Sequence, residues 1–372
     1  MKKRIVSWLS GVFTTGLLVA LLTPPAWASG VVDPLNRPAA IAVAPARAVL
    51  LDVTKAGERL VAVGERGLIV LSDDGGQHWR QAQKVPTSVS LTAVAFPTPT
   101  EGWAVGHAGV ILHTENGGET WVFQLDGSAA ARLALTAAQE NVEKAESENN
   151  FFQQQLEAAR MLVDDGPDKP FLDLAFLDEH SGFVVGAYGL MFRTQDGGHT
   201  WQPWMDRLDN PWGLHIYAIR IVGENVYLAG EQGLFLRSTD AGERFNRLDT
   251  PYEGTFFAVT ASEAGDVLLA GLRGNIYRSS DQGETFEPVA APLPISFSAV
   301  EQGEDGTLYF ANHAGFLLRS HDQGRTLTPL DAPRLPPIAA LESIGRTGLL
   351  TVGFGGAIPV SLEANGAEGG QP

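Results

Sequence analysis

Six acidic or amide side chains that could hold a metal ion or move a proton recur along this chain. They share the third position of the pattern Ser/Thr-x-Asp/Asn-x-Gly-x-x-aromatic, in which leucine once replaces the aromatic residue: Asp74, Asn116, Asp196, Asp240, Asp281 and Asp322. In such a turn the hydroxyl and the carboxylate can bond backbone N–H groups of the turn itself. A catalytic group repeated in every unit has no clear use, so we interpret all six as structural. Three turns end in tryptophans that we expect to pack in the core: Trp79, Trp121 and Trp201.

A second recurring side chain lies directly before the hydroxyl residue of the turn. In five of the six strong copies it is a histidine or an arginine: His113, Arg193, Arg237, Arg278 and Arg319. If the copies are related by rotation, these side chains lie on one arc of a ring, and guanidinium groups bind carboxylates and phosphates. We therefore name them as a candidate partner-binding site. The alternative is that each arginine pairs with an acidic group of its own or the neighbouring repeat.

The other histidines and arginines do not indicate an enzyme. His107, His215 and His313 fall in separate repeats without the spacing of zinc ligands. A sialidase-like glycoside hydrolase would need three inner-strand arginines beside its catalytic pair, and Arg220 is the one obvious candidate. The sequence has no P-loop and no nucleophile elbow. We predict a protein without catalysis, metal or cofactor, with the hydrolase as a remote alternative.

The N-terminal residues indicate export. A basic stretch at 2–4, an apolar stretch at 5–22 and a small-x-small site at 26–28 predict a Sec signal peptide over 1–28. Its removal takes the formal charge from −17 to −20, because three basic residues are lost. Such a charge disfavours nucleic acid, and the absence of cysteine leaves no disulfide and no site for lipid attachment. We expect a periplasmic protein with no stable membrane anchor after cleavage.

The turns belong to a repeated unit of about 42 residues, a length typical of propeller blades. Its six strong copies cover 60–79, 102–121, 182–201, 226–245, 267–286 and 308–327. Each copy reads as two strands around a Gly-x-x-Gly turn, with one strand-like run before it and a short outer strand after it. Four strands per unit predict one blade of a β-propeller.

A seventh, weaker copy lies at 338–363 and lacks both the turn motif and an outer strand. We expect residues 39–44 to complete this blade as a strand and to close an all-β, seven-bladed ring within 29–372. Six blades followed by a tail are the alternative. The first six blades should end near residues 83, 125, 205, 249, 290 and 331.

One gap, between the second and third repeats, is about twice as long as the others. It contains 128–165, which is rich in Ala, Glu and Gln and predicts helix. Apolar residues spaced alternately by three and four form a coiled-coil-like seam. Its members include Leu135, Val142, Phe152 and Leu156, and Asn149 is its one polar member. One long helix and a hairpin broken at 147–150 are both compatible with this pattern. The seam either packs on the propeller or docks a helix of a second copy or a partner.

The pattern Val-Gly-x-x-Gly-x-x-x-Arg-Thr-x-Asp-Gly-Gly-x-Thr-Trp at 185–201 resembles the Asp-box (BNR) repeat of the photosystem II stability and assembly factor family. This resemblance implies a non-enzymatic seven-bladed propeller that helps to assemble a membrane complex. For bacterial relatives it implies an accessory role beside an efflux-type transporter. An integral membrane protein or complex is the expected partner, and self-association through the insertion is a second expectation. A periplasmic carbohydrate- or peptide-binding propeller is the alternative function. The helical insertion departs from the photosynthetic members of the family.

Overall fold

The computed structural model describes residues 33–145 and 150–362. The predicted signal peptide at 1–28 lies outside the described residues. The described part of the chain belongs to one compact unit that begins at residue 33. Within it, no helix is long and apolar enough to cross a membrane.

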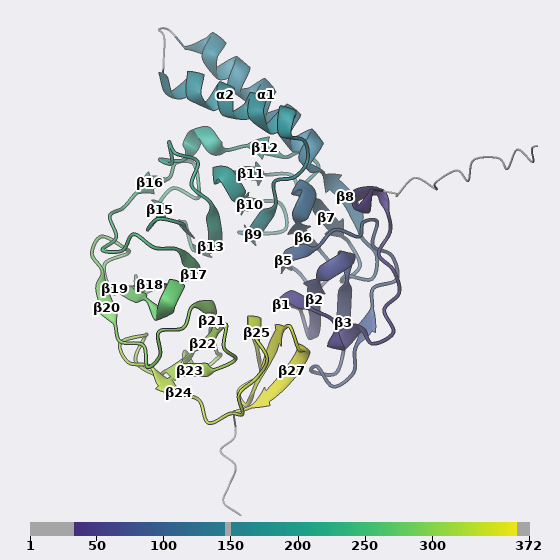
Figure 1. The fold of residues 1–372 in the computed structure, drawn as a ribbon, viewed down its shortest axis with the longest axis vertical. Coiled ribbons are helices and arrows are strands. Elements are labelled where there is room, and N and C mark those ends of the chain that lie inside the picture. The colour runs from purple at the N-terminus through teal and green to yellow at the C-terminus, as the bar shows by residue number, and fades with distance from the viewer. Residues whose placement is uncertain (1–32, 146–149, 363–372) are drawn as a thin grey trace, which may run out of the picture. The chain divides into compact units, whose positions relative to one another are not determined.

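Seven antiparallel sheets surround a central opening (Figure 1). In each sheet the first strand is innermost and the later strands follow outward in chain order. The strands of blades 1 to 3 are β1 (Leu50–Ala56), β2 (Arg59–Gly64), β3 (Ile69–Ser72), β4 (Arg80–Gln81), β5 (Leu91–Ala95), β6 (Gly102–Gly106), β7 (Ile111–Thr114), β8 (Val122–Leu125), β9 (Phe171–Phe176), β10 (Gly182–Gly186), β11 (Met191–Thr194) and β12 (Gln202–Pro203). Those of blades 4 to 7 are β13 (Ile216–Val222), β14 (Asn225–Gly230), β15 (Phe235–Ser238), β16 (Asn246–Arg247), β17 (Phe256–Ala261), β18 (Val267–Gly271), β19 (Ile276–Ser279), β20 (Glu287–Val289), β21 (Phe297–Gln302), β22 (Leu308–Asn312), β23 (Leu317–Ser320), β24 (Thr328–Pro329), β25 (Ile338–Ile344), β26 (Gly348–Gly353) and β27 (Gly356–Ser361).

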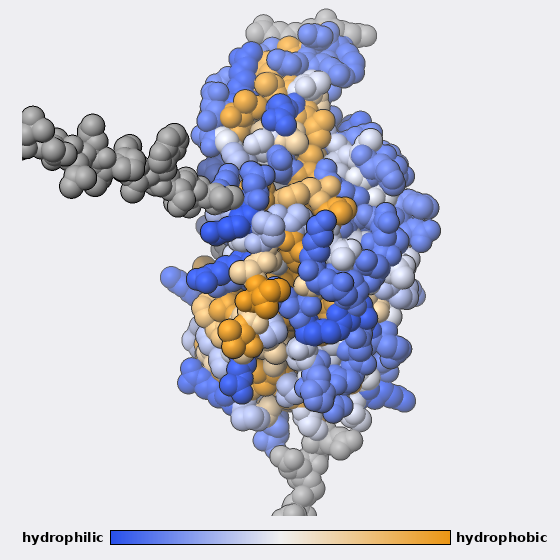
Figure 2. All heavy atoms as spheres, turned by 90° about the vertical axis from the view of Figure 1, so that its right-hand side faces the viewer, coloured by the Kyte–Doolittle hydropathy of each residue, from blue (hydrophilic) through white to orange (hydrophobic). Residues whose placement is uncertain are grey.

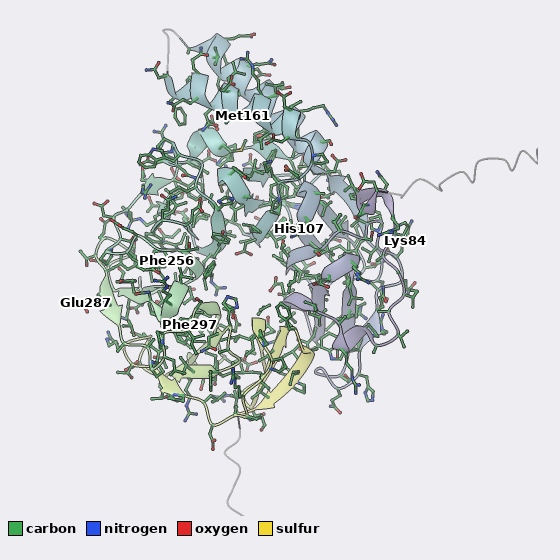
Figure 3. The ribbon with its side chains drawn as sticks, viewed as in Figure 1. Lys84, His107, Met161, Phe256, Glu287 and Phe297 are labelled. Carbon is green, nitrogen blue, oxygen red and sulfur yellow. The ribbon has the colours of Figure 1, made fainter. Side chains whose placement is uncertain are left out.

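The hydrophobic core lies between neighbouring blades rather than within one of them. Phe256 and Phe297 are the first residues of the inner strands β17 and β21, and both are fully buried (Figure 3). Phe256 packs with Tyr227 and Phe235 of blade 4, and Phe297 packs with Leu268 of blade 5. Each inner strand also contacts the next one around the ring, including β25 with β1. The predicted seven-bladed propeller is therefore confirmed.

The ring closes in a different way from the one expected. Among the described residues, blade 7 has three strands, and residues 39–44 are not in a strand. The Gln81 side chain on β4 holds this segment against blade 1, because its Nε2 donates to Ala40 O and its Oε1 accepts from Ala42 N, both over 2.9 Å. A 3-10 turn at Pro45–Arg47 follows at once and contacts both β4 and β27. The N-terminal segment thus bridges blades 1 and 7 without completing the sheet.

The insertion between blades 2 and 3 forms a helical hairpin, which was one of the two expected arrangements. Helix α1 (Gly127–Lys144) begins at Asp126, whose Oδ1 accepts from Ala129 N over 2.8 Å. Helix α2 (Asn150–Asp165) runs back beside it. Figure 2 shows apolar side chains gathered over this hairpin at the top of the view. Three of the four residues of the expected break at 147–150 lie outside the described residues.

Most described residues of the helical seam pack between α1 and α2, inside the hairpin. Leu156 is buried with three alanines of the two helices, and Leu135 and Val142 pack against the same cluster. Phe152 is half-buried, with its ring 5.7 Å from that of Phe151. Asn149 lies outside the described residues. The described seam residues therefore do not form a continuous apolar surface for a helix of a second copy or a partner.

Candidate functional site

The helical hairpin and the Gly-x-x-Gly turns lie on the same face of the ring, opposite the Asp-box turns. The chain enters α1 from the outer strand β8 and leaves α2 for the inner strand β9, so the hairpin begins and ends at the face where inner strands start. Helix α1 contacts the 3-10 turn at His107–Gly109, which is the Gly-x-x-Gly turn of blade 2. Figure 3 labels Met161 on the hairpin and His107 on this turn. We call this face the hairpin face.

Two glycines fix the base of the hairpin on the ring. A Cβ atom on Gly127 would lie 2.7 Å from Ala108 O and 2.9 Å from Pro167 Cα. A Cβ atom on Gly109, whose φ is +61°, would lie 2.6 Å from Gly127 Cα. Since real Cβ atoms do not approach other atoms so closely, the backbones meet here because both residues are glycines. The hairpin is therefore anchored by direct backbone packing.

A groove of about 230 Å³ separates the hairpin from blades 3 and 4; we call it the hairpin groove. One wall consists of α1 and α2, and the other consists of the turn at Ala187–Gly189 and the loop at 209–214. Three large apolar side chains of the groove are exposed: Met161 to 53%, Tyr188 to 57% and Trp212 to 74%. Such a concentration of exposed apolar side chains marks an interaction site.

The loop wall of the groove is held rigidly. Asn210 Nδ2 donates to Leu214 O over 2.9 Å, and its Oδ1 accepts from Leu214 N over 3.0 Å, which closes the loop that carries Trp212. Tyr188 has a left-handed backbone with φ at 58°. Lys169 Nζ lies 5.0 Å from the centre of the Tyr188 ring, and the His215 ring lies 4.9 Å from it. Trp212 and Tyr188 are therefore both held in place by neighbouring residues.

The groove lining is almost uncharged. Asp206 is its one charged side chain among the described residues, and it already accepts from Asn141 Nδ2 over 3.3 Å. Gln154 and Gln155 of α2 also line the groove, and their amides bond no other described residue. The indole N–H of Trp212 likewise has no acceptor in the described part of the chain. The groove thus combines apolar side chains with free, neutral hydrogen-bonding groups.

The arginines of the predicted partner-binding arc face the next blade. Arg193 Nη1 donates to Glu243 Oε1 of blade 4 over 2.7 Å, and its guanidinium lies 4.9 Å from the centre of the Trp204 ring. Arg237 donates to Gln282 O over 2.9 Å and to Glu284 Oε1 over 2.7 Å, both in blade 5.

Arg278 makes the same link one blade further along. Its Nε donates to Gln323 O of blade 6 over 2.9 Å, and its Nη2 pairs with the carboxylate of Asp266 in its own blade. Arg193 and Arg278 are both buried. These contacts favour the structural alternative, in which the arginines fasten neighbouring blades, for Arg193, Arg237 and Arg278.

The two remaining members of the arc differ from these three. His113 is buried, stacks on Trp103 with ring centres 4.6 Å apart, and lies 2.9 Å from Glu101 Oε2 through its Nε2. Arg319 faces blade 7, which has no Asp-box turn, and its guanidinium donates no hydrogen bond to that blade among the described residues. The arc is therefore not one uniform surface.

The Asp-box residues act within their own turns. Asp322 Oδ1 accepts from the Ser320 hydroxyl over 2.7 Å and from Thr326 N over 2.9 Å. The hydrogen bond from the Thr326 backbone is the main reason why the pKa of Asp322 falls to about 2. The same hydroxyl-to-acceptor bond is present in all six turns, at Asp74, Asn116, Asp196, Asp240, Asp281 and Asp322. This geometry supports the structural interpretation.

The tryptophans after the turns do not all bind in the same way. Trp79 and Trp121 donate to carbonyl groups of their own turns, Gly76 O and Gly118 O. Trp201 instead donates to Gln124 Oε1 of blade 2 over 3.2 Å, and the same oxygen accepts from Trp103 Nε1 over 2.9 Å.

Gln124 completes this link between blades 2 and 3 with its other amide atom. Its Nε2 donates to Gly197 O in the Asp-box turn of blade 3 over 3.0 Å. The sequence does not indicate this role, because Gln124 lies in an outer strand, and the sequences of the outer strands differ from blade to blade. By contrast, Trp212 follows Asn-Pro in a turn outside the repeats, where a tryptophan that belongs to no repeat could have been noticed.

The central channel, about 500 Å³ in volume, is lined by inner strands of all seven blades and carries buried carboxyl groups. Asp52 and Asp173 accept from Val94 N and Ile219 N of the following blades, each over 2.8 Å. Burial raises the pKa of Asp52 well above its usual value and that of Asp173 to about 7.

Two glutamates lie further along the same channel. Burial, followed by repulsion from Glu342, raises the pKa of Glu301 to about 8. Lys55 Nζ lies 3.6 Å from Glu342 Oε1, and Arg220 also lines the channel. Within the described residues, no group of three or more His, Cys, Asp or Glu side chains could hold a metal ion.

The fold and the site together define a class of protein. It is an Asp-box propeller in which arginines join neighbouring blades and one face carries an anchored helical hairpin. The chain belongs to the family described as Photosynthesis system II assembly factor YCF48, which matches residues 39–139 and 153–327. The predicted family is thereby confirmed.

Two curated relatives share short stretches with the chain. It is 34% identical over 92 residues to the photosystem II assembly lipoprotein Ycf48 of Synechococcus sp. (strain CC9902), which is 24% of this chain and 28% of that protein. It is 28% identical over 117 residues to the chloroplastic photosystem II stability/assembly factor HCF136 of Arabidopsis thaliana, which is 29% of each chain. The chain thus matches less than a third of the length of either relative.

Solved structures share the fold over a much larger part of the chain. One described as YCF48 bound to D1 peptide has a TM-score of 0.63 at 17% identity and covers 89% of this chain and 98% of its own. YCF48 from Cyanidioschyzon merolae has a TM-score of 0.58 at 15% identity and covers 84% and 95%. At these identities the likeness shows the propeller fold alone.

Proposed function

We propose that this protein is a non-enzymatic assembly factor that binds a segment of an integral membrane protein on its hairpin face. The hairpin groove is the observation that carries the proposal, because it exposes Met161, Tyr188 and Trp212 on rigid supports. Family membership supports an assembly role, and a structural relative is described as bound to a D1 peptide. The relatives reported above are named as assembly factors, which supports a role without catalysis.

The proposed location is the periplasm. The basic, apolar and small-x-small residues at 1–28 support export. Their removal takes the formal charge from −17 to −20, and a high net charge keeps a protein soluble. The membrane partner belongs either to a photosynthetic complex, as the family description indicates, or to a transporter of the efflux type. The hairpin groove can serve either partner.

Site-specific photo-crosslinking in envelope membranes tests this proposal. A benzoylphenylalanine at Gln154 in the groove should link the mature protein to an integral membrane protein. The control is the same group at Glu287, an exposed residue of β20 away from the hairpin (Figure 3). Equal crosslinking at both positions, or no membrane protein at Gln154, would refute the proposal.

A further inference from the structure

We propose that the hairpin groove binds an extended, uncharged peptide segment with apolar side chains. This inference rests on the proposed function for the role of the groove and goes beyond it by naming the conformation and chemistry of the bound segment. The supporting observations are the neutral lining, the free amides on α2 and the exposed side chains on both walls.

The free amides favour an extended segment over a helix. In a helix, backbone N–H and C=O groups already bond one another, so a helix in the groove would cover the amides of Gln154 and Gln155 without pairing them. Covering unpaired polar groups is costly. An extended chain leaves its own N–H and C=O groups free, and a glutamine amide can donate to one and accept from another. The Trp212 N–H can serve a further carbonyl group.

The charge of the lining excludes several other occupants. A phosphate or carboxylate group would find no cation among the lining residues themselves. The nearby cations of Lys169 and Arg247 lie over the rings of Tyr188 and Trp212, 5.0 and 5.4 Å from the ring centres. A buried charge without a partner is strongly unfavourable. A cationic segment would meet only Asp206, which already accepts from Asn141. Apolar side chains instead gain by covering Met161, Tyr188 and Trp212. Charge complementarity therefore selects an uncharged segment.

Both walls are fixed before binding, which lowers the cost of association. Asn210 closes the loop that carries Trp212, and the contact between Gly109 and Gly127 anchors the hairpin. Preorganised sites lose less conformational entropy on binding. A volume of about 230 Å³ holds a few side chains rather than a folded domain.

Selection from a random peptide display library on the full mature protein tests the inference. Enriched peptides should be uncharged, apolar at spaced positions, and able to adopt extended conformations, including sequences with proline. One enriched peptide is then synthesised with blocked ends and a fluorophore, and its affinity is measured by fluorescence anisotropy.

Variants assign the binding to the groove. Trp212→Ala should weaken the peptide at least about tenfold, as expected for an exposed aromatic anchor. The double variant Gln154→Ala with Gln155→Ala should weaken it severalfold. Leu133→Ala is the matched control, because Leu133 is exposed on α1 but does not line the groove, and it should leave binding unchanged. Far-ultraviolet circular dichroism verifies that each variant is folded.

The inference is overturned if no peptide is enriched, if charged or helix-forming peptides dominate, or if Trp212→Ala binds as well as the parent. These outcomes differ from a failure of the proposed function. Crosslinking at Gln154 to a membrane protein together with helical library peptides would retain the function and reject the extended segment. Apolar peptides at Trp212 without a membrane crosslink would do the reverse.

Discussion

Arg193 Nη1 in blade 3 lies 2.7 Å from Glu243 Oε1 in blade 4, although the two residues are 50 positions apart in the chain. The contact crosses a blade boundary at the Asp-box turn. Arg237 and Arg278 cross the next two boundaries to Gln282 O and Gln323 O in the corresponding turns. The Asp-box turn therefore caps its own blade and also receives an arginine from the blade before it.

Arg193→Gln should lower the free energy of unfolding by about 1–3 kcal/mol, because it removes a buried cation from a carboxylate and from the rings of Phe183 and Trp204. Glu243→Gln should cost less than about 1 kcal/mol, since the Glu243 side chain is 54% exposed. Urea denaturation measures both values, with the surface variant Arg325→Gln as control. Normal stability together with lost partner binding would instead restore Arg193 to a binding site.

Gln124→Leu should destabilise the propeller by about 2–3 kcal/mol, because the indole N–H groups of Trp103 and Trp201 would lose their acceptor. Gln81→Leu is the matched control on β4, where the amide holds only residues 39–44. Its effect should be smaller, since that segment is more exposed. Thermal unfolding of both variants makes the comparison, and equal losses would contradict the proposed role of Gln124.

The Glu301 carboxyl group should make the protein less stable as pH rises from about 4.5 to about 8. Its pKa is about 8 in the folded chain, above the ordinary glutamate value, so the folded state holds a proton that the unfolded state has released. Stability is thus greatest at the acid side of this window and falls as Glu301 ionises.

Glu301→Gln should reduce this dependence, because glutamine does not ionise, while Asp52, Asp173 and Glu342, whose pKa values burial also raises, retain their share of it. The measurement is urea denaturation at pH 5 and pH 8 for the parent and the variant. Lys55, Arg220 and Glu342, whose charges act on Glu301, stay in place in both proteins. An unchanged difference between the two pH values would show that Glu301 is not responsible.

Gly127→Ala should displace the hairpin while leaving the ring folded. The new Cβ atom would lie 2.7 Å from Ala108 O, so the base of α1 must move away from the blade 2 turn. Binding of the selected peptide should weaken because one wall of the groove moves. Gly166→Ala is a useful control, since a Cβ atom there meets nothing within 4 Å, although its φ of +82° brings a small strain cost. Retained binding in Gly127→Ala would argue against a rigid hairpin wall.

The sequence was sufficient to predict the ring because each blade is a local repeat. Every Asp-box turn is closed by hydrogen bonds between residues two to four positions apart, as from Ser320 and Thr326 to Asp322. Such contacts can be read from spacing alone. For the insertion the sequence predicted helix but left one long helix and a hairpin both open, because the poor helix formers at 147–150 only permit a break.

Contacts between blades could not be predicted in the same way. The pairing of Arg193 with Glu243 depends on how neighbouring blades are rotated and offset, which the repeat does not specify. The expected strand at 39–44 failed for a related reason, because the amide of Gln81 on blade 1 captures the Ala40 and Ala42 backbone. The groove was missed because it joins the insertion to a loop more than 40 residues further along the chain.

The arginine contacts also have a direction, and this direction determines where the ring is weakest. Blades 3, 4 and 5 each donate an arginine hydrogen bond to the next Asp-box turn, whereas the guanidinium of Arg319 in blade 6 donates none to blade 7 among the described residues. Local opening should therefore begin between blades 6 and 7, and backbone amides of β23 should exchange with solvent before those of β11 and β15. The ring would then open preferentially at one boundary, between blades 6 and 7, and not with equal ease at every boundary.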